Sequence, residues 1–367
     1  MKYVAEFRDR DSSLRLAEQI HATVTRPWRI MEICGGQTHS ILRSGIPQLL
    51  PPSLELIHGP GCPVCVTPEQ RIDEAIAVAH QPDRVLCSFG DMLRVPGTSQ
   101  SLLEARALGA HVQMVTSPLD AVELAKQHPD KQFVFFAVGF ETTAPATAVA
   151  LKHARAAALP NFQVLIAHVR VPPALEVLLG DPDCAVNGLL AAGHVCSVMG
   201  TSEYEPLAER FGLPIAVTGF EPVDILQGVL ACVKMLEQGQ HRVENHYARV
   251  VREQGNPVAR ALVDEVFEVT DLPWRGFGTI PCGGLRLGPA YAQFEAKPTL
   301  PALVRAQPSR LVCQSALVLA GRIRPPQCPA FGKQCTPSTP LGAPMVSSEG
   351  ACAAYFRHAP MTQMAEP

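Results

Sequence analysis

The sequence predicts an α/β protein in which two parallel-sheet domains face a cleft and a smaller, irregular domain follows at the C-terminus. Short apolar runs alternate with stretches of helical periodicity, and turn residues bound the runs. After Asp271 the chain becomes rich in proline, glycine and cysteine, which is typical of irregular structure. Because 367 residues exceed what one hydrophobic core normally holds, we divide the chain into a first α/β domain (28–160), a second (161–255) and a third (1–27 with 256–367).

The elements of the α/β domains are expected in a regular order. Six apolar runs of strand length come first: RIMEIC (29–34), LELIHG (54–59), RVLCSFG (84–90), HVQMVTS (111–117), FVFFAVGF (133–140) and FQVLIAHV (162–169). Helical spacing lies between them in PEQRIDEAIAVAHQ (68–81), SLLEARALGA (101–110), PLDAVELAKQH (118–128) and APATAVALKHARAAA (144–158). A smaller α/β layer is predicted by GLLAAGHVCSVMG (188–200), PIAVTGF (214–220) and EPVDILQGVLACVKMLEQG (221–239).

One helix start is marked especially clearly. Thr67 is followed by Pro68 and then by Gln70, which is the pattern of a capping box with proline at the first helical position. We therefore expect a helix to begin directly after Cys65.

Composition excludes several classes of protein. Hydrophobic residues make up 47% and charged residues 18%, which is a globular composition. The net charge is −3, and no basic run could follow a phosphate backbone, so nucleic acid is not expected as a partner. The first twenty residues lack an apolar signal core, and no stretch is long enough to span a bilayer, so we expect a cytoplasmic protein without a membrane partner.

Unusual short motifs follow several of the predicted strands. In open parallel sheets, ligands bind at the carboxyl ends of strands, so these motifs predict a site. In CGGQTH, the glycines let the chain turn sharply beside Cys34, which we expect to face the cleft, with His39 near enough to tune a thiolate. Further candidates for positioning in the cleft are Thr38, Asp91, Arg94, Glu141, Thr142, His168 and His194.

The segment Cys62-Pro-Val-Cys65 has the spacing of a redox-active dithiol. The same spacing also forms half of many zinc sites. Because the chain has no second C-x-x-C or H-x-H pair, we favour a reversible disulfide.

The C-terminal region carries four further cysteines in the pattern C-x14-C-x6-C-x16-C, namely Cys313, Cys328, Cys335 and Cys352. Four thiolates suit either a [4Fe-4S] cluster or a structural zinc ion, and the spacing favours neither. The remaining cysteines match no ligand pattern and are expected to be small apolar residues: Cys87, Cys184, Cys196, Cys232 and Cys282.

Seven stretches across nearly the whole chain resemble the HypD family of hydrogenase maturation factors. They are MEICGGQTH (31–39), IHGPGCPVCVTP (57–68), GDMLRVPG (90–97), FFAVGFETT (135–143), AHVRVPPAL (167–175), AVTGFEPVDIL (216–226) and CPAFGKQCTPSTPLGAPMVSSEGACAAYF (328–356). The chain departs from many family members at Ser315, where they have a cysteine, and at Ala167, Ala191 and Ala192.

The resemblance implies an iron-sulfur scaffold protein on which the Fe(CN)2CO group of [NiFe] hydrogenases is assembled. The four C-terminal cysteines would then bind a [4Fe-4S] cluster, making the third domain an iron-sulfur domain. Cys62 and Cys65 would relay electrons, and Cys34 would hold the iron together with a cysteine of a small HypC-type chaperone. A HypE-type partner would deliver cyanide.

Two other functions are compatible with the residues. The chain could be a stand-alone iron-sulfur thiol-disulfide oxidoreductase that works through Cys62 and Cys65. It could also be an interaction protein whose C-terminal cysteines form a zinc clamp. Neither function requires CGGQTH at the end of a strand, which favours the scaffold.

Overall fold

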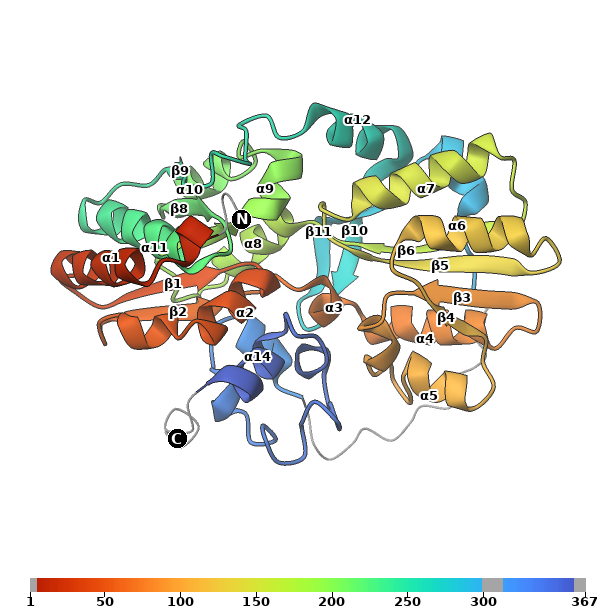
Figure 1. The fold of residues 1–367 in the computed structure, drawn as a ribbon, viewed down its shortest axis with the longest axis horizontal. Coiled ribbons are helices and arrows are strands. Elements are labelled where there is room, and N and C mark those ends of the chain that lie inside the picture. The colour runs from red at the N-terminus through yellow and green to blue at the C-terminus, as the bar shows by residue number, and fades with distance from the viewer. Residues whose placement is uncertain (1–4, 299–312, 360–367) are drawn as a thin grey trace.

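The computed structural model describes residues 5–298 and 313–359 of the chain. Two parallel sheets lie side by side along the long axis of the molecule, and the C-terminal region lies below the junction between them (Figure 1). The predicted α/β class with two parallel sheets is confirmed. Among the described helices, none combines the length and the apolar character that a membrane crossing needs.

The first sheet has five strands in the order β2-β1-β7-β8-β9, and every neighbouring pair is parallel. Strand β1 is central, since it pairs with β2 on one side and with β7 on the other. The strands are β1 (Trp28–Glu32), β2 (Leu54–His58), β7 (Gly188–Ala192), β8 (Ile215–Thr218) and β9 (Val243–Asn245).

The second sheet has four parallel strands in the order β4-β3-β5-β6. Strand β5 is almost entirely buried, as its continuous apolar run predicts for a sheet covered on both faces, and the second half of its neighbour β3 is buried too. The strands are β3 (Arg84–Ser88), β4 (Val112–Met114), β5 (Gln132–Gly139) and β6 (Phe162–His168).

Helices cover the faces of both sheets (Figure 1). Helix α1 (Arg10–Thr23) packs on α11 (Pro222–Glu237), whose apolar side is buried against the first sheet. The other helices of the two sheet layers are α2 (Gly35–Arg43), α3 (Pro63–Val66), α4 (Glu69–Ala79), α5 (Leu102–Ala107), α6 (Pro118–Gln127), α7 (Ala144–Ala156), α8 (Val171–Leu179), α9 (Gly193–Met199), α10 (Glu205–Phe211) and α12 (Pro257–Val266).

The strand pairing corrects the predicted grouping into residues 28–160 and 161–255. The chain leaves the first sheet after β2, builds the whole second sheet with β3 to β6, and returns to the first sheet at β7. Strands β1 and β2 therefore pair with strands of the second range, while β6 pairs with β5. Parallel strands are joined by long crossovers, so an apolar run does not reveal which sheet it joins.

The predicted helix after Cys65 exists, but it starts differently. A four-residue helix, α3, contains Cys65, and α4 begins only at Glu69. The Thr67 hydroxyl donates to the Pro63 carbonyl at the end of α3, and no side chain caps α4. The predicted capping box is therefore wrong, because Thr67 closes the preceding turn instead.

The region after α12 is more regular at its start than expected. Strands β10 (Phe267–Trp274) and β11 (Gly278–Leu287) form an antiparallel ribbon with an irregularity between Thr270 and Leu272, and β11 packs beside β6 and α8. The rest is irregular as predicted, with only α13 (Ser315–Leu319) and α14 (Ala351–His358) as α-helices among its described residues.

Candidate thiol site and cysteine cavity

Cys34 follows β1 and forms the N-cap of α2. A Cβ on the next residue, Gly35, would lie 2.5 Å from the Glu349 Cβ and 2.6 Å from the Glu349 carbonyl oxygen, so only glycine allows this approach. The Gly35 N–H donates to the Gly61 carbonyl at 2.8 Å, and a Cβ on Gly61 would lie 2.2 Å from the Cys34 nitrogen. The glycines thus press the Cys34 loop against the loop that leads to Cys62.

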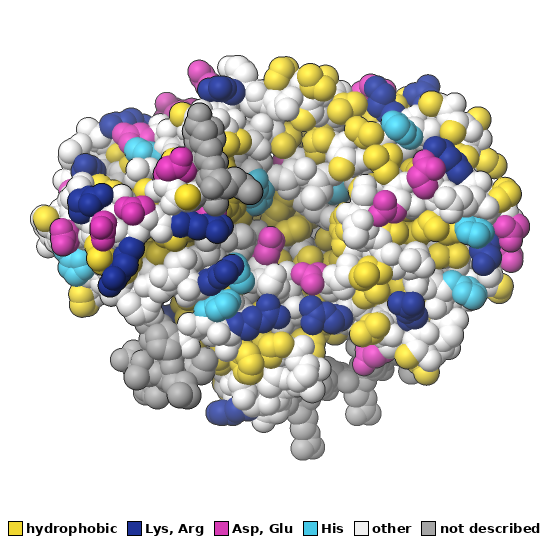
Figure 2. Space-filling view, viewed as in Figure 1, with side chains coloured by type: hydrophobic (Ala, Val, Ile, Leu, Met, Phe, Trp, Pro, Cys, Tyr) yellow, Lys and Arg dark blue, Asp and Glu magenta, His cyan; other side chains and the backbone are white. Residues whose placement is uncertain are grey.

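Figure 2 shows a hollow between the two sheet halves, with hydrophobic side chains on its floor and acidic side chains near its rim. We expected Cys34 to face such a cleft, but its side chain is completely buried. The ring of Phe220 lies 3.3 Å from the position of a Cβ on Gly36, and His194 covers the sulfur. The thiol therefore lies beneath the surface rather than at the cleft wall.

His194 is a basic side chain in direct contact with the Cys34 sulfur. Its Nδ1 lies 3.6 Å from the Cys34 Sγ, and its ring stacks on Phe220 with a centroid separation of 5.2 Å. Burial lowers the pKa of His194 to about 4, and burial also raises the pKa of the Cys34 thiol well above its ordinary value. A neutral thiol therefore stands beside a neutral imidazole near pH 7.

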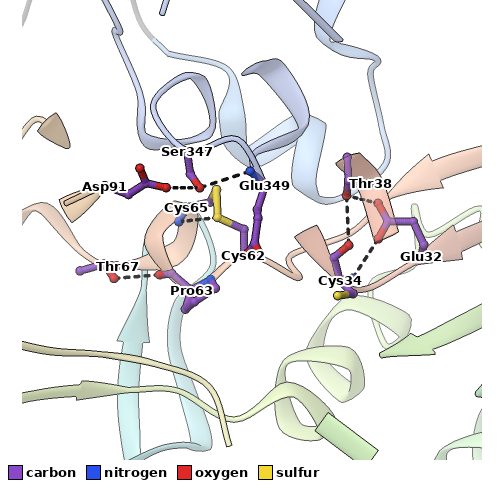
Figure 3. The surroundings of a disulfide bond; sticks show 10 residues. All are labelled: Glu32, Cys34, Thr38, Cys62, Pro63, Cys65, Thr67, Asp91, Ser347 and Glu349. Atoms are coloured by element: carbon purple, nitrogen blue, oxygen red, sulfur yellow. Dashed lines mark hydrogen bonds between the residues drawn. A yellow bond between two sulfur atoms is a disulfide. The ribbon is translucent and has the colours of Figure 1, made fainter. Parts of the chain in front are cut away.

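A buried carboxylate lies on the other side of Cys34. The Glu32 Oε2 accepts from the Cys34 N–H at 2.8 Å, and its Oε1 accepts from the Thr38 hydroxyl. Figure 3 shows these two bonds, and the Nδ1 of His58 lies 2.6 Å from the same Oε1. Thr38, a predicted site residue, thus contacts both Glu32 and the Cys34 carbonyl.

Cys62, the N-cap of α3, forms a disulfide with Cys65 inside this helix, and both are almost fully buried. The Cys65 N–H points to the Cys62 Sγ at 3.2 Å. Figure 3 shows the disulfide below the C-terminal segment that carries Ser347 and Glu349, with the Cys34 loop to one side. The three cysteines that the sequence singled out are therefore brought together.

Hydrogen bonds tie the loop after β3 to the C-terminal segment. The Ser347 hydroxyl donates to the Asp91 Oδ2 at 2.8 Å, and the Arg94 guanidinium donates to the Val346 carbonyl at 3.0 Å. Partial burial and the nearby Asp91 carboxylate raise the pKa of Glu349, which keeps part of its side chain in solvent. Asp91 and Arg94, both predicted, thus hold this segment over α3.

The four C-terminal cysteines line one small cavity. Its wall is otherwise mostly apolar and includes Val318, Ala330, Phe331, Leu341 and Met345. Burial raises the pKa of Cys352 well above its ordinary value, and the neighbouring cysteines raise it further. Burial likewise raises the pKa of Cys335, whose sulfur accepts from the Leu341 N–H at 3.4 Å.

The possible metal ligands in this cavity, four cysteine thiols, are those that an iron-sulfur cluster needs. Four thiols, an apolar wall and a backbone N–H directed at a sulfur are what such a cluster uses. A Cβ on Gly342 would lie 2.3 Å from the Cys313 Sγ, so glycine is needed at this wall. Within residues 5–298 and 313–359, no three His, Cys, Asp or Glu side chains are grouped closely enough to hold a single metal ion.

The remaining predicted residues lie elsewhere. His39 packs edge-on against His358 of α14, with ring centroids 5.0 Å apart. His168 is buried at the end of β6, with its Nε2 3.0 Å from the Thr147 hydroxyl, and burial lowers its pKa to about 4. Thr142 is half-buried in the turn between β5 and α7.

Glu141 is fully buried in the same turn. Its Oε1 accepts from the Val171 N–H at 2.9 Å, but its Oε2 has no partner among the described residues. Burial raises the pKa of Glu141 to about 7. Glu141 and His168 thus belong to the end of the second sheet, and their hydrogen bonds go to Val171 and Thr147 rather than to Cys34.

Sequence reasoning missed Glu32, His58 and Glu349. A signal was present for Glu32, since it is a charged residue inside the otherwise apolar run RIMEIC. Nothing in the local pattern of His58 or Glu349 indicated that the fold would bring them to Cys34. Of the cysteines without a ligand pattern, Cys87, Cys196 and Cys232 are buried as expected, Cys184 is half-buried and Cys282 is exposed.

The fold and the site define a cysteine-rich α/β protein with a buried thiol beside a disulfide and a separate four-cysteine cavity. The family model described as "HypD: Hydrogenase formation hypA family" matches residues 11–359. The chain belongs to the HypD family and is a hydrogenase maturation factor.

Three curated relatives illustrate the match. The hydrogenase maturation factor HypD of Rhodobacter capsulatus is 46% identical over 98% of this chain and 98% of its own length. The HypD of Escherichia coli strain K12 is 44% identical, with 98% of each chain covered. The HypD of Cupriavidus necator is 41% identical over 98% of this chain and 97% of its own length.

Proposed function

We propose that the protein is the scaffold on which the Fe(CN)2CO group of [NiFe] hydrogenases is assembled, with Cys34 as an iron ligand. The observation that carries the proposal is the placement of a single buried thiol beside a neutral imidazole and a disulfide, in a hydrogenase maturation factor. A HypC-type chaperone would supply a second thiolate, and a HypE-type partner would deliver cyanide.

Cys34 suits iron that carries cyanide and carbonyl ligands, because such iron prefers soft thiolate donors. The thiol must lose its proton when it binds the metal. His194, with a neutral ring nitrogen 3.6 Å from the sulfur, is placed to accept that proton. Because Cys34 has no exposed surface, His194 and Phe220 must move before iron and a partner's thiolate reach it.

The disulfide would serve as the electron relay of the scaffold. Its reduction takes two electrons and two protons and yields the Cys62 and Cys65 thiols. The short segment Ala343–Met345 supports this role, because it contacts α3 while Met345 lines the four-cysteine cavity. These three residues therefore connect the four-cysteine cavity with the helix that carries the disulfide.

Cys313, Cys328, Cys335 and Cys352 would hold a [4Fe-4S] cluster, which supplies single electrons when bound. The chain's own part is to shield the site. Its apolar wall excludes water, and the N–H directed at Cys335 stabilises charge on that sulfur.

The test is infrared spectroscopy of the protein purified without oxygen together with its co-produced small chaperone. We expect cyanide and carbonyl stretching bands that disappear in Cys34→Ala, while the absorbance of the iron-sulfur cluster is retained. Bands of normal intensity in Cys34→Ala would remove Cys34 from the iron site. A cluster-containing complex without any bands would favour the stand-alone thiol-disulfide oxidoreductase.

A further inference from the structure

Glu32 is the most unusual charged residue near the site, because its side chain is completely buried at the end of a central strand. A buried carboxylate is costly unless hydrogen-bond donors surround it. In this structure Glu32 has such donors on both oxygens. The surrounding residues therefore form a binding environment that suits a carboxylate.

Two of the groups that donate to Glu32 belong to the turn that begins at Cys34. The Glu32 Oε2 accepts from the Cys34 N–H, and its Oε1 accepts from the Thr38 hydroxyl. The Thr38 N–H in turn donates to the Cys34 carbonyl at 2.9 Å. Glu32 thus holds both ends of the first turn of α2, at whose start Cys34 stands.

Glu32 is itself fixed from the far side by His58. The two residues are direct neighbours in the parallel register of β1 and β2, and the His58 Nδ1 lies 2.6 Å from the Glu32 Oε1. The His58 ring packs edge-on against Tyr355 of α14, with centroids 5.3 Å apart. Because α14 also carries Cys352, a line of contacts leads from the cysteine cavity to the Cys34 turn.

We propose that Glu32 is a positioning residue for metal bound at Cys34, and that His58 and Tyr355 hold it in place. Glu32 fixes the main chain of Cys34 by accepting from the Cys34 N–H, and so fixes the direction of the side chain. The inference rests on the proposed function, because it assumes that Cys34 binds iron. Groups that orient a metal ligand in this way commonly change metal affinity about 10- to 100-fold when they are replaced.

The first experiment is infrared spectroscopy of Glu32→Gln in the full chain, purified without oxygen with its small chaperone. We expect the cyanide and carbonyl bands to fall about tenfold in intensity. The remaining bands should also shift in position, because the Cys34 main chain is no longer fixed and the sulfur holds the iron in a different geometry. Bands with the intensity and position of the wild type would overturn the proposal.

Asp73→Asn is the matched control. Asp73 is also a buried carboxylate, and it accepts from the N–H and hydroxyl of Thr98, in the contact between α4 and the loop before α5. Its replacement should lower stability but leave the band positions unchanged. An equal band shift in both variants would show a general effect of lost buried carboxylates and contradict the inference.

A second measurement does not depend on iron. We expect Cys34 in the metal-free Glu32→Gln protein to be alkylated about tenfold faster than in the wild type, because the turn that buries the thiol loosens. Mass spectrometry of the Cys34 peptide gives the rate. An unchanged rate would refute the positioning role, whereas bands missing from the wild type itself would refute only the iron scaffold.

Discussion

At the scale of single residues, burial sets the chemistry of the site more than local charge does. Cys34 and His194 are both kept neutral because they are removed from water, although each would otherwise titrate closer to pH 7. Neither group therefore places a charge in the interior until metal arrives. This is a different state from the exposed thiolate that the glycine-rich turn first suggested.

Glu141 gives a prediction at the same scale. Its pKa is raised to about 7 from an ordinary value of 4.5, so the folded protein binds the proton more tightly than the unfolded chain does. The stability contributed by this group therefore falls as pH rises from about 4.5 to about 7, and it stays low above that range. Glu141→Gln should gain stability relative to the wild type over this window, by an amount on the order of 3 kcal/mol.

Chemical denaturation of both proteins between pH 5 and pH 8 measures this difference. Glu18→Gln, on the exposed side of α1, is the control for loss of a surface carboxylate and should show no such trend. Stability curves of wild type and Glu141→Gln that stay parallel over the whole range would contradict the prediction.

At the scale of elements, the loops around the site contact one another mainly through their backbones. The loop after β1, the loop after β2 and the C-terminal segment before α14 meet at Gly35 and Gly61. Of these two glycines, Gly35 was predicted as a turn former. Their positions show that they mainly make room for neighbouring backbone.

Gly35→Ala should therefore destabilise the contact between α2 and the C-terminal segment. The added Cβ would meet the Glu349 Cβ at 2.5 Å and its carbonyl oxygen at 2.6 Å, and neither can swing aside like a flexible side-chain end. We expect a loss of about 1–3 kcal/mol in the free energy of unfolding. Urea denaturation measures the loss.

Gly90→Ala is the control for this substitution. Its added Cβ would meet the Met114 sulfur at 3.2 Å, but Met114 is exposed and flexible enough to move. Equal losses in both variants would show that the tight approach of Glu349 does not decide the cost.

At the scale of the whole molecule, the C-terminal region closes over the junction of the two sheets. It touches the first sheet through α14 and α2, and the loop of the second sheet through Asp91 and Arg94. The four-cysteine cavity lies inside this region. A group bound in the cavity would thus stabilise the cover over the disulfide and Cys34.

Serine substitution of each cavity cysteine tests this organisation. In Cys313→Ser, Cys328→Ser, Cys335→Ser and Cys352→Ser, iron and acid-labile sulfide should fall about tenfold or more, and the melting temperature should drop. Cys184→Ser, at a half-buried cysteine outside the cavity, should retain both. Zinc in place of iron in the wild-type protein would contradict the cluster and support the zinc clamp.

Much of the fold could be predicted from local pattern. The runs that form β1 to β8 were placed within a few residues, because buried parallel strands are continuous apolar segments between turn residues. The start of α4 was displaced because Thr67 closes α3 instead of capping the next helix. The order of the strands in the sheets was missed, because the sequence of a parallel strand does not show which other strand it pairs with across a long crossover.

The sequence by itself determined the α/β class, the cysteines that gather in two sites, and the family. These features depend on residue type, periodicity and spacing, which are local properties of the chain. Only the tertiary structure decided that Cys34 is buried, that His194 lies beside it, and that Glu32 and His58 hold its turn. Burial and contacts between segments far apart in sequence arise when β1, β2 and β7 pair and the C-terminal region closes over them.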